Sequence, residues 1–159
     1  MPSESRHLKT VRSVLADYDT RGVFGGLVET RIRKDVTQFQ FSWLYRRKYT
    51  VELNERTATL TVRDCFPHVP PRSDLHGGII DFLKHRSSDE LPKHRRLDAN
   101  RAEVSCRNRG GSVSLYLKVK RNQYRYGARK LINLLHETFL MIDQYFTEYL
   151  YEYFDLPEE

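Results

Sequence analysis

Two hydrophobic periods alternate along the chain, and their order predicts the fold class. Between Ser3 and Tyr18 the apolar positions recur at helical spacing on one face, with Ser3 or Ser5 as the N-cap. Segments in which apolar and polar residues strictly alternate follow, which indicates strands with one buried and one exposed face. These segments begin near Val28, Phe39, Tyr49 and Ala58. The first two form either two strands or one strand with an irregular lead-in.

The second half of the chain repeats this order of helix and strands. Pro67, Pro70 and Pro71 end the first group of strands, and a helix is expected from about Leu75 to Ser87, capped by Ser73 or Asp74. The polar, basic composition of residues 88–100 predicts a surface loop that connects this helix to the next strand.

A hairpin and a terminal helix complete the pattern. The hairpin turns at Asn108–Gly111, and the helix runs from about Gly127 to Phe154. We therefore expect one α+β domain over residues 1–159. It has two layers, with a one-sided antiparallel sheet and flanking helices in the order α-β-β-β(-β)-α-β-β-α, and a long C-terminal helix.

The terminal helix carries an unusually wide apolar stripe, which spreads over nearly half its circumference or more. A single contact with a sheet needs less, so either the domain wraps this helix or part of it meets a partner. Tyrosine suits such an interface because it joins a large apolar area to a polar tip. The candidate protein-binding residues are Tyr145, Phe146, Tyr149, Tyr151, Tyr153 and Phe154.

Charge adds a second candidate surface. The chain has 159 residues, 27 Lys and Arg against 21 Asp and Glu, and a net charge of +6. Residues 118–130 contain bases and no acids, whereas residues 137–159 contain acids and no bases. The outward strand positions are expected to include Arg31, Arg33 and Arg63. The candidate nucleic-acid-binding residues on the same face are Arg107, Tyr116, Lys118 and Lys120.

No motif indicates catalysis, a cofactor or a bound metal. His136-Glu137 lacks a second histidine four residues on, and His76-Gly77-Gly78 is not accompanied by a nucleophile elbow. No phosphate-binding glycine loop is present, and Cys65 and Cys106 do not form a C-x-x-C pair. We expect a protein that is not an enzyme. The enzymatic alternative would need a pocket that gathers His68, Cys65 or His136.

The compartment is expected to be the cytoplasm. The first twenty residues are polar and charged, unlike a signal peptide, and no apolar run reaches the ~18 residues of a membrane span. Two cysteines suit a reducing environment.

The order of elements resembles the type III secretion chaperone-like fold, including its YbjN-type branch. The stretch Gly127–Leu140, with the sequence GARKLINLLHETFL, and the segment Tyr149–Glu159 also look like the end of YbjN-type proteins. The resemblance implies a small bacterial α+β protein, often homodimeric, without cofactors or catalytic residues. The chaperones of this fold bind extended client segments on hydrophobic patches, and YbjN-type members are linked to regulation. Secretion chaperones tend to be acidic, whereas this chain is basic.

These observations favour a protein-binding module, chaperone-like or regulatory, which we expect to be a homodimer. The alternative is a nucleic-acid-binding module that uses the basic outer face of the sheet.

Overall fold

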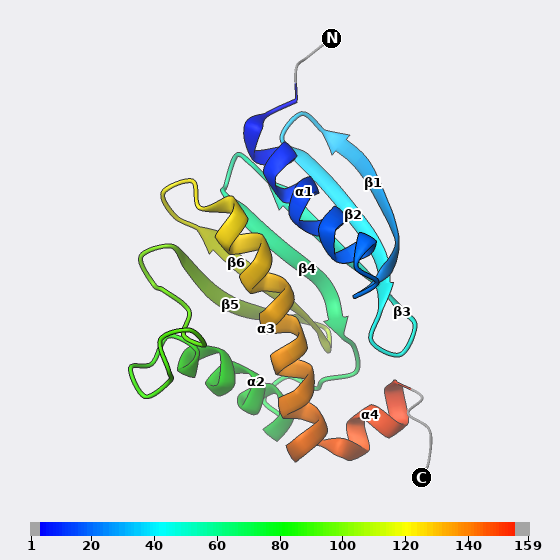
Figure 1. The fold of residues 1–159 in the computed structure, drawn as a ribbon. Coiled ribbons are helices and arrows are strands. Elements are labelled where there is room, and N and C mark those ends of the chain that lie inside the picture. The colour runs from blue at the N-terminus through cyan, green and yellow to red at the C-terminus, as the bar shows by residue number, and fades with distance from the viewer. Residues whose placement is uncertain (1–3, 155–159) are drawn as a thin grey trace.

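The computed structural model describes residues 4–154 and shows four helices and a six-stranded sheet in that range (Figure 1). The helices are α1 (Arg6–Thr20), α2 (Asp74–His85), α3 (Tyr124–Tyr145) and α4 (Thr147–Tyr153). The strands are β1 (Gly25–Arg33), β2 (Val36–Trp43), β3 (Arg47–Asn54), β4 (Thr59–Phe66), β5 (Ala102–Arg109) and β6 (Ser112–Val119). The expected α+β class is confirmed, and the segment near Val28 is a strand of its own.

The sheet is antiparallel throughout, in the order β1-β2-β3-β4-β6-β5. The helices α1 and α3 lie side by side across one face of it, and α2 packs against β5 and α3 (Figure 1). The core lies between this helix layer and the sheet. It includes Phe39 and Phe41 of β2, Leu117 of β6 and Leu135 of α3. The opposite face of the sheet carries no described helix (Figure 1).

Local side-chain bonds set the helix starts that the sequence predicts. The Ser5 hydroxyl accepts the Leu8 N–H at 3.0 Å and begins α1, and the Ser73 hydroxyl accepts the His76 N–H at 3.2 Å and begins α2. Each bond satisfies one of the free N–H groups of a first helical turn.

The terminal helix differs from the expected continuous one, because α3 ends at Tyr145 and α4 follows after Phe146. Phe146 has φ −138° and ψ 43°, outside the helical region. Its ring lies against Gly78 of α2, where a Cβ atom would come within 3.0 Å of the ring. The break turns α4 back onto the core, so Tyr149, Leu150 and Phe154 are buried. The wide apolar stripe is therefore divided between α3 and α4, which pack against different parts of this domain.

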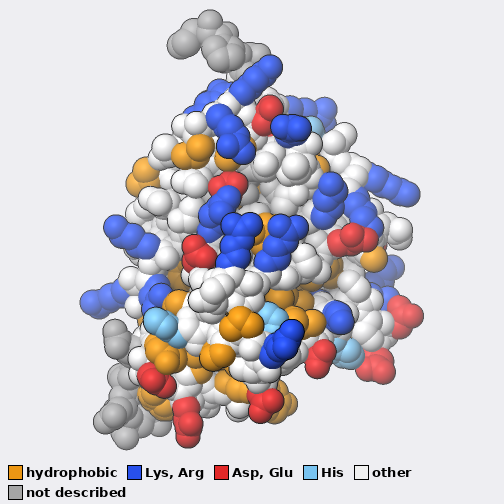
Figure 2. All heavy atoms as spheres, turned by 180° about the vertical axis from the view of Figure 1, so that it is seen from behind, with side chains coloured by type: hydrophobic (Ala, Val, Ile, Leu, Met, Phe, Trp, Pro, Cys, Tyr) orange, Lys and Arg blue, Asp and Glu red, His pale blue; other side chains and the backbone are white. Residues whose placement is uncertain are grey.

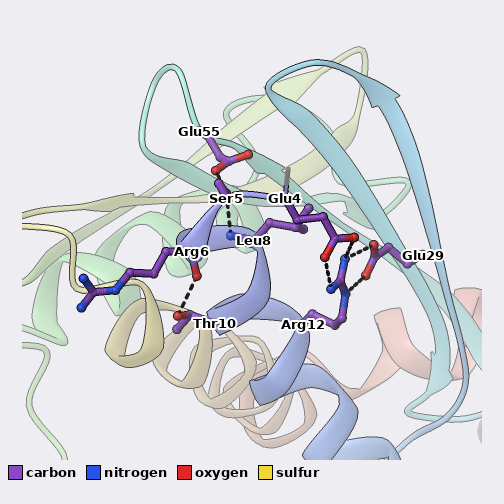
Figure 3. A network of polar contacts seen from close by, with 8 residues as sticks. All are labelled: Glu4, Ser5, Arg6, Leu8, Thr10, Arg12, Glu29 and Glu55. Carbon is purple, nitrogen blue, oxygen red and sulfur yellow. Dashed lines mark hydrogen bonds and ion pairs between the residues drawn. The ribbon is translucent and has the colours of Figure 1, made fainter. Parts of the chain in front are cut away.

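The edge strand β1 reverses the expected inward and outward faces. Paired residues in antiparallel strands share a face, and Glu29 pairs with the buried Phe39. Glu29 thus lies on the helix side, where Arg12 of α1 bonds its carboxylate at 2.7 Å (Figure 3).

The placement of Arg31 on the outer face was accordingly wrong. Arg31 pairs with the buried Thr37 and lies on the helix side, whereas Val28 pairs with Gln40 and faces out, 55% exposed. At this edge α1 and β1 contact each other through ion pairs rather than apolar side chains. The alternation of apolar and polar residues in β1 does not show which of its two faces contacts α1.

The connector from α2 to β5 packs against the domain through Leu97. This residue is buried, and its N–H donates to the Arg86 carbonyl at 2.8 Å.

Within residues 4–154, no helix is both long and apolar enough to span a membrane.

Candidate functional site

The uncovered face of the sheet forms a shallow hollow of about 530 Å³ over β3, β4, β6 and β5. We call this surface the open face. Figure 2 views the molecule from that side, and Lys and Arg side chains gather across its middle. The residues that line the hollow include Glu52, Thr61, Arg63, Ser105, Arg107, Arg109, Tyr116 and Lys118.

The strand register places one polar row across the middle of the open face. Gln38 lies opposite Glu52, Glu52 opposite Thr61, and Thr61 opposite Tyr116. Glu52 and Thr61 are only 9% and 6% exposed although they face away from the core. Neighbouring side chains rise above them, so the middle of the face is sunken.

A single carboxylate organises the centre of this face. The guanidinium of Arg63 donates two hydrogen bonds to Glu52, at 2.8 and 2.9 Å, and Gln38 donates a third at 3.3 Å. These bonds, with that from Arg63 as the main cause, hold the pKa of Glu52 below its usual value. Glu52 is therefore ionised at neutral pH, and it neutralises Arg63.

Three of the four candidate nucleic-acid-binding residues, Arg107, Tyr116 and Lys118, lie on β5 and β6, and Lys120 directly follows β6. The Arg107 guanidinium sits 4.7 Å from the centre of the Tyr116 ring. Lys118 Nζ donates to the Thr57 carbonyl at 2.8 Å. Lys120 follows β6 at the rim, where its ammonium donates to the Glu103 carboxylate at 2.7 Å.

Arg109 belongs to the same surface, although it is absent from the four residues expected from the sequence. It lies two residues after Arg107 on β5, so the strand period puts both on one face, and it lines the hollow. No carboxylate in the described part of the chain forms an ion pair with Arg107 or Arg109. Their charges are therefore available to a ligand.

The six candidate protein-binding residues do not form one surface. Tyr149 and Phe154 are core residues, and the Tyr149 hydroxyl donates to the Pro67 carbonyl. Phe146 and Tyr153 are partly buried, and the Tyr153 ring stacks on His68 at 4.5 Å. Only Tyr145 and Tyr151 of the six are well exposed.

A groove with exposed apolar residues lies instead between α2 and α3. It measures about 340 Å³ and is only half apolar, since Phe82, Leu140, Met141 and Tyr145 line it together with Arg86, Arg95, Glu137 and Gln144. Leu140 and Tyr145 are 52% and 69% exposed. We call it the α2–α3 groove.

The residues that an enzymatic alternative would need have other contacts. The Cys65 thiol is fully buried and donates to the Val113 carbonyl at 3.4 Å, and burial raises its pKa, which opposes thiolate formation. His136 lies 5.6 Å from the Trp43 ring, and His68 stacks on Tyr153. Residues 4–154 contain no cluster of three or more His, Cys, Asp or Glu side chains that could hold a metal ion.

Comparison with protein-family models, with curated proteins and with solved structures finds no match to this chain.

Proposed function

We propose that this chain is a nucleic-acid-binding module and that the open face is its binding surface. The observation that carries the proposal is the group formed by Arg107, Tyr116 and Lys118, in one hollow that no described helix covers. Arginine and lysine neutralise phosphates, and an aromatic ring with a stacked guanidinium offers planar surfaces to bases.

The rest of the hollow suits a polar ligand better than an apolar one. Hydroxyl groups of Thr59, Thr61 and Ser105 line it, and these side chains commonly bond phosphate and sugar oxygens. The two carboxylates that line it, Glu52 and Glu103, are already paired with Arg63 and Lys120. Phosphates approaching Arg107 and Arg109 thus meet little repulsion.

The test is a titration of labelled, mixed-sequence oligonucleotides at several salt concentrations. The triple variant R107Q/R109Q/K118Q should lose most of the affinity, because it removes three exposed cations without emptying the core. The slope of log affinity against log salt should become shallower by about 0.7 to 0.9 for each phosphate that the variant no longer neutralises.

A matched control separates a specific surface from net charge. The variant K9Q/K34Q/K84Q removes three exposed lysines on α1, on the β1–β2 turn and on α2. It should bind nearly as the parent protein does. Equal losses in the two triple variants, or no salt-sensitive binding by the parent protein, would overturn the proposal.

A second candidate is the protein-binding function expected from the sequence, relocated to the α2–α3 groove. Leu140 and Tyr145 support it, since large apolar side chains this exposed are typical of contact surfaces. The occupant we propose is a second copy of the chain, as expected for a homodimer.

Light scattering tests this second candidate. The parent protein should give the mass of a dimer at micromolar concentration, and L140S/Y145S should give that of a monomer. Y151S, which changes an exposed tyrosine on α4, serves as the control and should remain dimeric. If the parent protein stays monomeric, the proposed homodimer is refuted.

A further inference from the structure

A second basic hollow lies between the connector and the start of α3. It measures about 630 Å³ and has Tyr126 of α3 on one wall. We call it the Tyr126 hollow. The residues that line it include Lys93, His94, Arg96, Asp98, Ala99, Arg101, Tyr126 and Lys130.

Two cations lie over the ring of Tyr126. The Arg101 guanidinium lies 4.7 Å from the centre of its ring, and Lys130 Nζ lies 5.6 Å from it. The Tyr126 hydroxyl accepts the Asp98 N–H at 2.8 Å, which fixes the ring against the connector. The contact between the Arg101 guanidinium and the Tyr126 ring repeats the Arg107–Tyr116 contact of the open face.

The hollow keeps a surplus of positive charge. Its acids are Asp89 and Asp98, which face Arg96 at 3.5 Å and Arg101 at 3.9 Å. Both pairs are long and their carboxylates are exposed, so the pairs stabilise little, although the Arg96 guanidinium also donates to the Leu91 carbonyl at 2.9 Å. Lys93 and Lys130 have no ion-pair partner within residues 4–154.

Lys120 joins the two hollows. Its ammonium donates to the Ala99 carbonyl at 2.8 Å and to the Glu103 carboxylate at 2.7 Å. Ala99 lines the Tyr126 hollow, whereas Glu103 lines the hollow of the open face. A path therefore runs from the cations of the open face along β5 and β6, past the Lys120–Glu103 ion pair, to Lys130.

We propose, resting on the nucleic-acid function above, that the ligand is a single strand that follows this path from the open face into the Tyr126 hollow. The start of α3 packs on β6 and β4 on the helix side of the sheet (Figure 1), whereas the open face is on the other side, so the path turns from one face of the sheet to the other. A duplex has a persistence length of about 150 base pairs and resists so tight a turn. A single strand bends freely and can place bases on both tyrosines.

The experiment uses the double variant K93Q/K130Q, which leaves Tyr126 and its hydrogen bond intact. Binding is measured with single strands of about 4 and about 12 nucleotides, and with a duplex of about 12 base pairs. The variant K9Q/K84Q is the charge-matched control, and thermal unfolding shows whether each protein is folded.

The expected result is a length-dependent weakening. K93Q/K130Q should bind the short strand as the parent protein does and the long strand more weakly. Its salt slope for the long strand should be shallower by about 1.4, because two phosphates at about 0.7 each are no longer neutralised. The affinity ratio of parent to variant should then fall about sevenfold between about 50 and about 200 mM salt. The duplex should bind the parent protein more weakly than the long strand.

Three results would overturn the continuous path: equal long-strand affinity in K93Q/K130Q and the control, failure of K93Q/K130Q to bind the short strand, or a duplex that binds as tightly as the single strand. In each case R107Q/R109Q/K118Q would still lose most of the affinity if the open face is the primary site. A parent protein that binds no oligonucleotide would instead overturn the proposed function and the path with it.

Discussion

Gly127 is the position at which a single added carbon should have the clearest effect on stability. A Cβ atom there would lie 2.9 Å from Val119 Cγ2 and 3.1 Å from Leu117 Cδ2. Leu117 can move the end of its side chain, but the β-branched Val119 has little rotamer freedom. The substitution G127A therefore forces α3 away from β6 or strains the strand.

Gly77 provides a matched control, since each glycine is the fourth residue of its helix, α2 or α3. A Cβ atom at Gly77 meets nothing within 4 Å. G77A should stabilise the protein by about 0.5–1 kcal/mol through helix propensity alone. G127A gains the same amount but is destabilised by about 1–3 kcal/mol through overpacking. The difference between the two variants thus isolates the packing contribution, about 1–3 kcal/mol.

Urea unfolding followed by the fluorescence of Trp43, the single tryptophan, measures both variants. Each kcal/mol should also move the melting temperature by about 2–4 °C. If G127A is as stable as G77A to within about 0.5 kcal/mol, α3 does not approach β6 as closely as argued, and the packing of the core would need revision.

Three further outcomes are expected. The substitution E52Q should lower the free energy of unfolding by about 1–2 kcal/mol, a range that allows for the half-exposed Arg63. It should also strengthen oligonucleotide binding, because it frees the Arg63 guanidinium, so urea and binding titrations should show lower stability together with higher affinity. The pKa of Glu52 is lowered in the folded state, so its contribution to folding stability is complete above the unfolded pKa of about 4.5 and is lost as the pH falls through the folded pKa. The difference in unfolding free energy between the parent protein and E52Q should therefore narrow below pH 4.5, and a difference that stays constant in acid would contradict this. Burial raises the pKa of both thiols and covers Cys65 completely, so an alkylating reagent followed by mass spectrometry should modify Cys106 first, and faster reaction of Cys65 would contradict its placement in the core.

The sequence predicted the turns and helix starts well because interactions between residues close in the sequence form them. The turn at Asn108–Gly111 needs left-handed backbone, and Gly110 and Gly111 supply it with φ of 56° and 93°. Ser5 and Ser73 cap helices because their hydroxyls reach free N–H groups. The open face also follows from period two, which put Arg107, Tyr116 and Lys118 on one side of the sheet.

The features that the sequence could not supply depend on partners distant along the chain. The sunken centre of the open face comes from Glu52, Arg63 and Gln38, whose alignment across three strands requires the register. The Tyr126 hollow requires the connector to fold back against α3. The positions of Arg101 and Lys130 in the sequence do not indicate that both side chains contact the ring of Tyr126.

The terminal helix shows how a correct pattern can lead to the wrong surface. A helical wheel projects residues 127–154 along one straight axis, so two stripes that face different walls are added into one that looks too wide. The break at Phe146 separates them: Leu135 faces the sheet, whereas Leu150 closes the end of the core. Once the domain itself covers this stripe, the argument for a partner shifts to surfaces that nothing in residues 4–154 covers. The hollow of the open face is larger than the α2–α3 groove, and its unpaired cations, Arg107 and Arg109, favour an anionic ligand over an apolar one.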